Sequence, residues 1–213
     1  MTIFIARHLQ SVGYRVVVLS RGYGGRAEKQ GGVVSDGQRI YMDPDSAGDE
    51  AFMMAAKLVG IPVLVGRDRY RSGANAIRYF HAEVVVLDDG YQHLRLQRDL
   101  NLLLLDARRP FGNGHLLPRG PLRVPISSSI QADAIVFTRC PLEDPVFALP
   151  REIAEHSKVF RTRHMPALYR VSDSTRGQAG VYPATLAPFE TADIVGARVL
   201  AFSGIADNIN FKK

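Results

Sequence analysis

The sequence predicts an α/β domain in which helices cover both faces of a mainly parallel sheet. Segments with a helical period alternate along the chain with short runs of Val, Leu and Ile. These runs are continuously apolar instead of alternating with polar residues, which is typical of strands buried on both faces. A hydrophobic fraction of 46% supports a core of that kind.

The predicted elements follow one another in a regular order. Apolar residues at a helical spacing predict a helix over 2–11, which Gly13 ends. A buried strand is expected over 15–19, followed by a hairpin over 33–42 with Asp36 and Gly37 as its turn. The remaining expectations are helices over 48–59, 70–80 and 146–156, a loop over 110–125, and strands over 62–65, 83–87, 100–105, 134–138 and 198–202.

We expect three regions along the chain. Residues 1–157 form an α/β core, 158–197 a β-rich appendage or linker, and 198–213 a strand that returns to the core. Because a helix comes before any strand, we expect the chain to begin inside a βαβ unit, without the unit's first strand. That strand would lie within the sheet, so its loss would leave unpaired strand edges. The pattern also breaks off at 210–213, where another helix should begin.

Composition excludes several classes of protein. The one cysteine, Cys140, has no Cys or His at metal-ligand spacing and cannot form an internal disulfide. No apolar run reaches the roughly 18–20 residues of a membrane span, so we expect a soluble chain or one that lies on a membrane surface. The formal charge is +6, and 22 of the 27 basic residues are arginine. Arginine suits phosphate recognition, although genomic base composition also raises its content.

Polar residues follow the predicted strands, at the edge where open parallel sheets bind ligands. The run Val84–Leu87 is followed by Asp88 and Asp89, a Walker-B pattern. One carboxylate can meet a Mg²⁺-nucleotide, directly or through water, while the other serves as general base. The alternative is that these aspartates only form a turn.

Other candidates lie near the same edge. His93 either orients the base, binds substrate, or packs in a loop. The glycines of Ser20–Gly25 either let a ligand approach the backbone or form a plain turn. A group of five arginines either binds an anion or simply lies on a face exposed to solvent. This group consists of Arg67, Arg69, Arg71, Arg119 and Arg123.

Together these segments resemble one family, the tetraacyldisaccharide 4'-kinases, which are the lipid A 4'-kinases of Gram-negative bacteria. The strings DDGYQH and GNGHLLPRGPLR carry most of the resemblance, and the segments occur in the family's order. The matching stretches are LSRGYGGR (19–26), GDEAFMMA (48–55), PVLVGRDRYRSG (62–73), VVVLDDGYQHLRLQRDLNLLLLDA (84–107), PFGNGHLLPRGPLRVP (110–125), ADAIVFTR (132–139) and LAFSGIAD (200–207).

The resemblance implies a P-loop-kinase-like three-layer fold and the use of ATP and Mg²⁺. It implies phosphorylation of the 4'-hydroxyl of a tetraacylated glucosamine disaccharide 1-phosphate at the cytoplasmic face of the bacterial inner membrane. The expected contacts are this substrate and, peripherally, the membrane surface, with neither nucleic acid nor a known protein partner. The implied catalytic residues are Asp88, Asp89 and His93. Asp89 is also implied to hold Mg²⁺, directly or through water. The implied substrate contacts are Arg21, Gly22, Tyr23, Gly24, Arg67, Arg69, Arg71, Gln92, Arg119 and Arg123.

The sequence also departs from the family pattern. The family's GGTGKTP loop, whose amides and lysine hold the phosphates, is absent from the printed sequence, as are its upstream hydrophobic helix and downstream Asp-His segment. A non-catalytic remnant or an anion-binding α/β module is therefore the alternative. A nucleic-acid-binding protein is disfavoured because the chain has no Trp and no motif that recognises nucleic acid. A Rossmann enzyme is disfavoured because the chain has no G-x-G-x-x-G turn between an early strand and helix.

We expect the 213-residue chain on its own to show no measurable kinase activity. Positioning and electrostatic stabilisation provide most of the catalysis in phosphoryl transfer, and both depend on a phosphate-binding loop. The measurement is transfer of labelled phosphate from ATP to the disaccharide 1-phosphate. Robust labelling by the purified chain would contradict the expectation.

Overall fold

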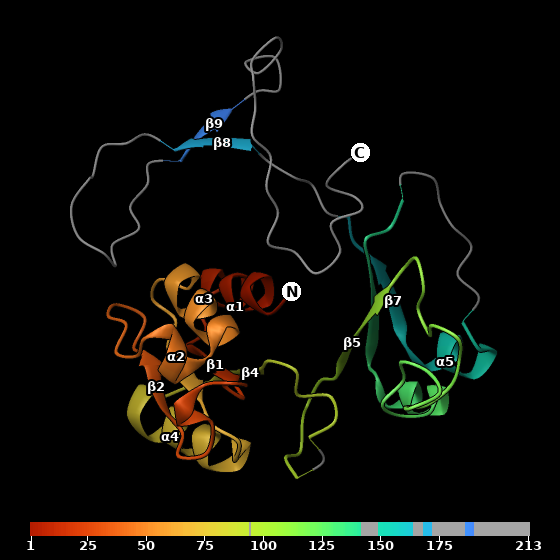
Figure 1. Ribbon diagram of the computed structural model, residues 1–213, viewed down its shortest axis with the longest axis horizontal. Coiled ribbons are helices and arrows are strands. Elements are labelled where there is room, and N and C mark those ends of the chain that lie inside the picture. The colour runs from red at the N-terminus through yellow and green to blue at the C-terminus, as the bar shows by residue number, and fades with distance from the viewer. Residues whose placement is uncertain (94, 142–148, 164–167, 172–185, 190–213) are drawn as a thin grey trace.

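A computed structural model of the protein describes residues 1–93, 95–141, 149–163, 168–171 and 186–189. Figure 1 shows the order of the elements along the chain. The helices are α1 (Thr2–Ser11), η1 (Arg26–Glu28), α2 (Pro44–Ala47), α3 (Asp49–Lys57), α4 (Arg69–Phe80), η2 (Ile126–Gln131) and α5 (Arg151–His156). The strands are β1 (Val16–Ser20), β2 (Gly32–Ser35), β3 (Val63–Val65), β4 (Val84–Leu87), β5 (Leu102–Asp106), β6 (Ala134–Thr138), β7 (Lys158–Arg161), β8 (Leu168–Val171) and β9 (Leu186–Phe189).

The described strands form three sheets. The first has the order β2-β3-β1-β4, in which β1 is parallel to both β3 and β4, while β2 is antiparallel to β3. The second has the order β5-β6-β7 and is parallel throughout. The third is the antiparallel pair of β8 and β9. The mainly parallel α/β class is thus confirmed.

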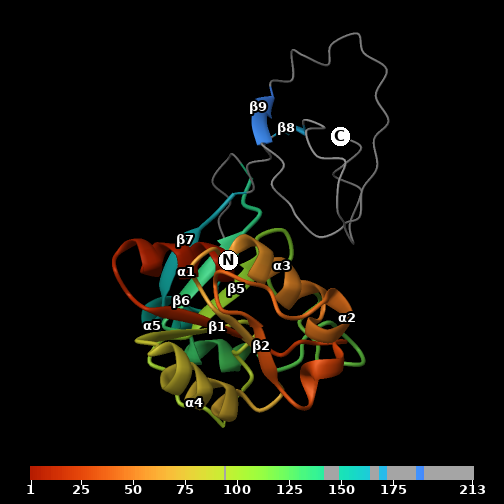
Figure 2. The same ribbon diagram turned by 90° about the vertical axis from the view of Figure 1, so that its left-hand side faces the viewer.

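Helices cover both faces of the first sheet, and every residue of β1 is therefore buried. Val16 and Val18 pack in one cluster with Ala6 of α1 and Ala51 of α3. Val17 and neighbouring residues face the other way, into a cluster that contains Ala76 of α4. Figure 2 shows α4 on one side of the strands and α1 and α3 on the other. Successive side chains of a strand point to opposite faces, so a strand covered on both faces must be apolar throughout.

Local sequence signals begin and end α4. The Asp68 carboxylate accepts a hydrogen bond from the backbone N–H of Arg71 at 3.1 Å, which caps the first turn. The helix ends at His81, which adopts the left-handed conformation with φ of 50°. No described helix of the protein is both long and apolar enough to cross a membrane.

Most predicted elements agree with the structure to within a few residues. The helix predicted over 146–156 begins only at Arg151 in the described residues, and larger differences occur in three places. The helix over 2–11 and the strand over 134–138 are confirmed with the predicted bounds. The hairpin over 33–42 is only partly correct, because β2 pairs mainly with β3 and its second arm is a single bridge between Ser35 and Ile40. Its turn lies one residue later than predicted, because the N–H of Asp36 donates to the carbonyl of Arg39 and leaves Gly37 and Gln38 as the two turn residues. The Asp36 carboxylate accepts from the N–H groups of Gln38 and Arg39.

The second difference is the boundary of the core after residue 157. Lys158–Arg161 was predicted to begin the β-rich appendage, but as β7 it pairs in parallel with β6 and belongs to the core sheet. Its polar residues are tolerated because it is exposed and pairs on one edge only among the described residues. The pair of β8 and β9 lies in the region predicted to be β-rich, and the strand predicted over 198–202 lies outside the described residues.

The third difference is that the strands of the core form two sheets instead of one. β4 ends the first sheet and β5 begins the second, and neither has a strand partner on its other edge among the described residues. Unpaired edges of this kind were expected from the sequence, although the identity of the strand that would fill them stays a prediction.

Two glycine substitutions should change stability in opposite directions. A Cβ at position 25 would lie 2.5 Å from the Ser46 carbonyl oxygen, so Gly25→Ala should lower the free energy of unfolding by about 1–3 kcal/mol. In α4, a Cβ at Gly73 would meet its nearest neighbour at 3.8 Å, so Gly73→Ala should raise it by about 0.5–1 kcal/mol. Urea unfolding followed by circular dichroism measures both, and equal effects of the two substitutions would contradict this packing.

Candidate functional site

The carboxyl ends of β1, β3 and β4 meet at one edge of the first sheet. The backbone N–H of Gly66, just after β3, donates to the carbonyl of Ser20 at 3.1 Å. The N–H of Asp88, just after β4, donates to the carbonyl of Leu19 at 2.9 Å. Parallel pairing therefore aligns these three ends at the edge where α/β sheets bind ligands.

The Asp88 carboxylate connects three elements at this edge. It accepts a hydrogen bond from the Thr2 hydroxyl of α1 at 2.9 Å through one oxygen. The hydroxyl of Ser20 at the end of β1 donates to the other oxygen at 3.4 Å. Asp88 is half-buried, so its orientation is fixed while part of the side chain stays accessible.

Asp89 points elsewhere. Its φ of 48° lies in the left-handed region, which aspartate tolerates better than most residues. The side chain is 83% exposed, and its Oδ2 lies 3.8 Å from Nη1 of Arg123, which comes from the loop over 110–125. The two adjacent carboxylates therefore have separate surroundings, one held by hydroxyls and one open to solvent beside an arginine.

Arg69 lies beneath this acidic edge. Only 4% of it is exposed, and its guanidinium donates to the carbonyls of Gly66 and of Asp88, the latter at 3.4 Å. Its Nε is buried without a hydrogen-bond partner. Burial lowers the pKa of the guanidinium from its ordinary value, and the Asp88 carboxylate opposes that shift.

This burial distinguishes Arg69 from the other predicted substrate arginines. Arg67 and Arg71, on either side of it, are exposed and form no ion pair with another described residue. Arg119 is exposed in the loop over 110–125, where its carbonyl accepts from the Asn113 side chain at 3.0 Å. The structure thus brings Arg69 and Arg123 to the acidic pair.

The glycine-rich loop packs against the junction of α2 and α3. Gly22 has a φ of +69°, and a Cβ there would lie 3.0 Å from the Ala47 carbonyl oxygen. Beside it, Tyr23 is 79% exposed, and Gly24 has open space around it. The close packing of this turn is enough to explain why residue 22 is glycine. The exposed Tyr23 side chain can contact a ligand.

Arg21 is partly engaged within this loop. Its Nε lies 2.7 Å from the Glu28 carboxylate, and this hydrogen bond lowers the pKa of Glu28 from its ordinary value. Its guanidinium also lies 6.0 Å from the ring centroid of Tyr23. A ligand anion would have to compete with Glu28 for this arginine.

His93 is half-buried and Gln92 is exposed in the segment after β4. The carbonyl of His93 accepts from Nη1 of Arg98 at 2.6 Å. Burial lowers the pKa of the His93 imidazole, and the positive charges of Arg69 and Arg98 lower it further. The ring is therefore biased toward its neutral form, which can accept a proton or a hydrogen bond.

The site also contains residues that the sequence analysis did not single out. Thr2 and Ser20 hold Asp88, and Glu50 of α3 lines a hollow together with Asp88 and Asp89. This hollow, the central hollow below, has a volume of about 1100 Å³ and is lined by residues of α1, α3, α4, β4, β5 and the segment between the last two. The sequence signal for Glu50 was its place in the first turn of α3, after Gly48, within a stretch that matched the family.

The first turn of α3 lies close to the glycine-rich loop. A Cβ at Gly48 would be 2.8 Å from the carbonyl oxygen of Tyr23. Asp49 and Glu50 follow directly and are exposed. Two further carboxylates therefore stand near the same edge of the sheet.

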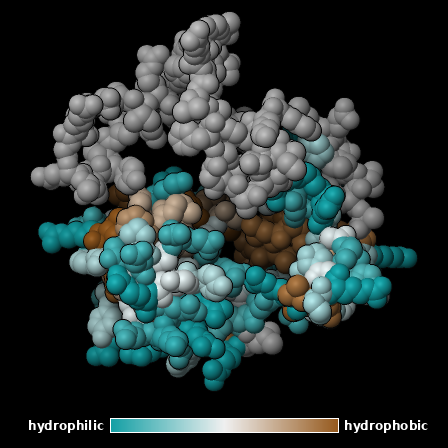
Figure 3. All heavy atoms as spheres, viewed as in Figure 1, coloured by the Kyte–Doolittle hydropathy of each residue, from teal (hydrophilic) through white to brown (hydrophobic). Residues whose placement is uncertain are grey.

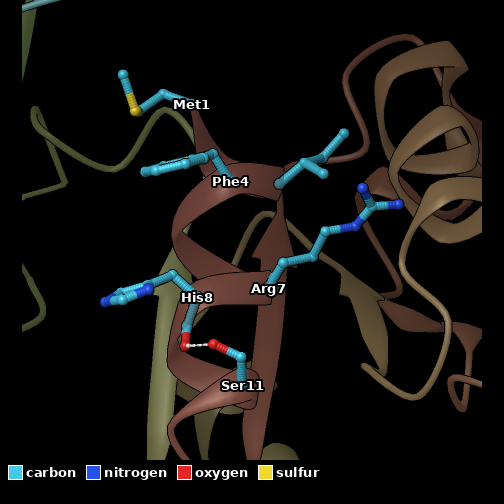
Figure 4. Close-up of a pocket in the computed structure, with 6 residues that line it drawn as sticks. Met1, Phe4, Arg7, His8 and Ser11 are labelled. Carbon is cyan, nitrogen blue, oxygen red and sulfur yellow. Dashed lines mark hydrogen bonds between the residues drawn. The ribbon is translucent and has the colours of Figure 1, made fainter.

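A second, shallower hollow of about 560 Å³ lies on α1, and none of the predicted site residues lines it. Figure 4 shows Met1, Phe4, Arg7, His8 and Ser11 around it, with the Ser11 hydroxyl bonded to the His8 carbonyl. Phe4 is 70% exposed. This surface combines apolar and basic side chains.

The carboxylates and hydroxyls at this edge fit a magnesium site in which the protein provides only some of the ligands, and water and phosphate oxygens provide the others. Among the described residues, no three His, Cys, Asp or Glu side chains are arranged to hold a metal by themselves. Mg²⁺ commonly takes one or two carboxylates and completes its octahedron with water and phosphate oxygens. Asp88, Asp89 and the hydroxyls of Thr2 and Ser20 provide donors of that type.

The chain is similar to known kinases over its whole length. The family model described as tetraacyldisaccharide-1-P 4'-kinase matches residues 1–213. A tetraacyldisaccharide 4'-kinase of Desulfatibacillum aliphaticivorans is 41% identical over 211 residues, which cover 99% of this chain and 55% of the relative. One of Pelobacter propionicus is 43% identical over 215 residues, covering 99% and 54%.

A solved structure is similar as well. LpxK from Aquifex aeolicus in complex with ATP has a TM-score of 0.64 and 32% sequence identity, covering 80% of this chain and 50% of that one. The chain spans about half the length of the curated relatives it matches.

The low pKa of His93 should be measurable by NMR titration of its ring. We expect a midpoint below about 6.5, the ordinary value, because burial and two arginines disfavour the imidazolium. The unfolded chain then binds a proton more readily than the folded one, so His93 should reduce stability as the pH falls below about 6.5. The variant His93→Gln should lose that part of the pH dependence, and a midpoint at or above 6.5 would contradict the assignment.

Proposed function

This chain belongs to the tetraacyldisaccharide 4'-kinase family, and we propose that it provides the acidic edge and the anion-binding surface for that family's reaction. The reaction is ATP-dependent phosphorylation of the 4'-hydroxyl of a tetraacylated glucosamine disaccharide 1-phosphate. The main support is the edge of the first sheet, where Asp88 and Asp89 stand together above the buried Arg69. Carboxylates and guanidinium groups at one edge suit a reaction between a nucleotide and a phosphorylated sugar.

In this proposal Asp88 is the general base. The hydroxyls of Thr2 and Ser20 orient its two oxygens, and partial burial limits its contact with water. A base must be held within hydrogen-bond reach of the proton it accepts. Asp88 would accept the proton of the acceptor hydroxyl as that oxygen forms its bond to the γ-phosphorus of ATP, while the bond from this phosphorus to the β–γ bridging oxygen breaks and ADP leaves.

Asp89 would hold magnesium, directly or through a bound water. Its exposed carboxylate is open to a nucleotide that arrives from solvent. A magnesium ion at this place would neutralise negative charge on the phosphates of ATP. His93, biased toward the neutral imidazole, would orient the base or the substrate by hydrogen bonding.

The exposed arginines would bind anionic groups of the substrate and the nucleotide. Arg67 and Arg71 are exposed just after β3 and in the first turn of α4, and Arg119 is exposed in the loop that also carries Arg123, which approaches Asp89. Gln92, Tyr23 and the backbone at Gly24 would add neutral contacts. Arg69 would act from beneath by fixing the carbonyls of Gly66 and Asp88, because its guanidinium is turned toward the backbone.

We also propose peripheral contact with the cytoplasmic face of the bacterial inner membrane. The substrate of the reaction carries acyl chains, and the outer face of α1 exposes Met1 and Phe4 beside Arg7 (Figure 4). Apolar and basic side chains on one helix face are typical of surfaces that lie on anionic lipid.

A chimera tests the proposal without depending on where this sequence begins or ends. Residues 1–213 replace the matching segment of the Desulfatibacillum aliphaticivorans relative, and phosphate transfer to the disaccharide is measured. We expect turnover by the chimera and a loss of about 10²–10⁴-fold for Asp88→Asn, the range for removal of a general base. Asp89→Asn should mainly raise the magnesium concentration needed for half-maximal rate.

The control is Asp45→Asn, a matched change on the exposed side of α2, which should leave turnover unchanged. If Asp88→Asn keeps full activity, Asp88 is not the base. The variants Asp49→Asn and Glu50→Gln then show whether the first turn of α3 provides it. A chimera that binds the phosphorylated disaccharide but never transfers phosphate would favour the alternative of a non-catalytic anion-binding module.

A further inference from the structure

An arginine holds both ends of the turn that follows the acidic pair. The backbone N–H of His93 donates to the carbonyl of Gly90 at 3.0 Å, so residues 90–93 form a tight turn. Nη1 of Arg98 donates to the same carbonyl at 3.2 Å and to the carbonyl of His93 at 2.6 Å. One nitrogen of this guanidinium therefore joins the first residue of the turn to the last.

Arg98 is itself fixed at its Nε. This nitrogen donates to the side-chain oxygen of Asn101, which lies just before β5. The N–H of Asn101 donates to the Asp133 carboxylate at 2.7 Å, and its carbonyl accepts from the Asp133 N–H at 3.0 Å. Asp133 directly precedes β6. Continuous hydrogen bonds therefore connect the second sheet, through Arg98, to the turn after β4.

Tyr91 attaches the same turn to the second sheet at another point. Its ring packs against the apolar cluster that contains Phe137 of β6 and Ile153 of α5. Its hydroxyl donates to the carbonyl of Ser128 in η2 at 2.9 Å. Burial raises the pKa of this phenol, which keeps the hydroxyl protonated as a donor. The place of the turn is thus set from the second sheet as well as by the end of β4.

The hydrogen bonds of Arg98 direct it to the backbone and not to a ligand anion. It is half-buried on a segment that lines the central hollow, and Figure 3 shows hydrophobic side chains in a recess at the middle of the molecule. A charge in partly apolar surroundings needs hydrogen-bond acceptors, and oxygens of Gly90, His93 and Asn101 provide them. The guanidinium of Arg98 is therefore already engaged, whereas Arg95 on the same segment is exposed.

Two arginines hold the backbone on either side of Asp89. Arg69 donates to the carbonyl of Asp88, and Arg98 donates to the carbonyl of Gly90. Asp89 lies between these carbonyls with a φ of 48°, a conformation that costs energy for a residue other than glycine. Hydrogen bonds from charged donors are stronger than those from neutral ones, so both carbonyls resist rotation. The direction of the Asp89 side chain depends on this pair of contacts.

We propose that Arg98 is a positioning residue, which sets where the side chains of Asp89 and His93 stand by holding the backbone of the turn between them. This role rests on the function proposed above for the acidic edge. Arg98 would act through the turn and not on the reacting atoms. Its loss would leave the residues of the site in place in the sequence but free to take other orientations.

Hydrogen exchange tests the hold on the turn in the 213-residue chain, without an assay of activity. We expect the His93 amide to exchange about tenfold faster in Arg98→Gln, because the turn opens more readily. Arg98→Lys keeps the charge but cannot span three acceptors, so exchange should be faster there too. The control Arg95→Gln removes a charge from the same segment and should leave the exchange rate unchanged.

Asn101→Ala is a milder variant that keeps the guanidinium and removes its anchor. The main-chain hydrogen bonds between Asn101 and Asp133 remain, so the chain should still fold, which circular dichroism verifies. The His93 amide should exchange faster than in the unaltered chain and more slowly than in Arg98→Gln.

The chimera described above tests the effect on the reaction. Arg98→Gln should lower kcat and raise the magnesium concentration for half-maximal rate, each by roughly 10–100-fold, the loss typical of groups that orient metal ligands. A purely structural role would only reduce the folded fraction, which lowers the apparent kcat and leaves the magnesium requirement unchanged. The control Arg78→Gln, at an exposed residue in the last turn of α4, should change neither quantity.

Two results would overturn the proposal. One is an unchanged exchange rate at His93 in Arg98→Gln, whatever the chimera does. The other is faster exchange with a normal kcat and magnesium requirement, because Arg98 would then only stabilise the turn. A chimera without turnover before any substitution contradicts the proposed function, and with it the role of Arg98 in the reaction, while faster exchange would still support its hold on the turn.

Discussion

The parallel pairing of β1 with both β3 and β4 is the constraint on which the rest of this structure depends. It brings the ends of three strands to one edge and places Ser20, Gly66 and Asp88 within reach of one another. Because β1 is buried on both faces, the same pairing requires α1 and α3 on one side and α4 on the other. The position of the candidate site therefore follows from the packing of one apolar strand.

Electrostatics at that edge combine a buried cation with carboxylates of different exposure. Arg69 is held by two backbone carbonyls, so it stabilises the turn after β4 and adds positive charge beneath it. Asp88 is oriented by hydroxyls, while Asp89 is free to meet a ligand. A neutral His93 fits the same field, because nearby arginines disfavour its protonated form. In the reaction we propose, this division of surroundings would let neighbouring side chains take different roles.

The central hollow relates the site to the stability of the fold. It is lined by Asp88 and Asp89 together with residues of β4, β5 and the helices α1, α3 and α4. The acidic edge and the apolar interior of the hollow are therefore continuous.

The sequence alone determined the class of the fold, most element bounds and the edge that carries the polar residues. Continuous apolar runs such as Val84–Leu87 are sufficient for this, because a local pattern reports burial on both faces. It did not determine that Lys158–Arg161 joins the core sheet, since strand partners are chosen by contacts distant in sequence. Only the tertiary structure separated the buried Arg69 from the exposed Arg67 and Arg71, and brought Thr2 to Asp88 and Glu50 to the same hollow. Neighbouring residues of one type look alike in sequence, and only packing decides which of them faces solvent.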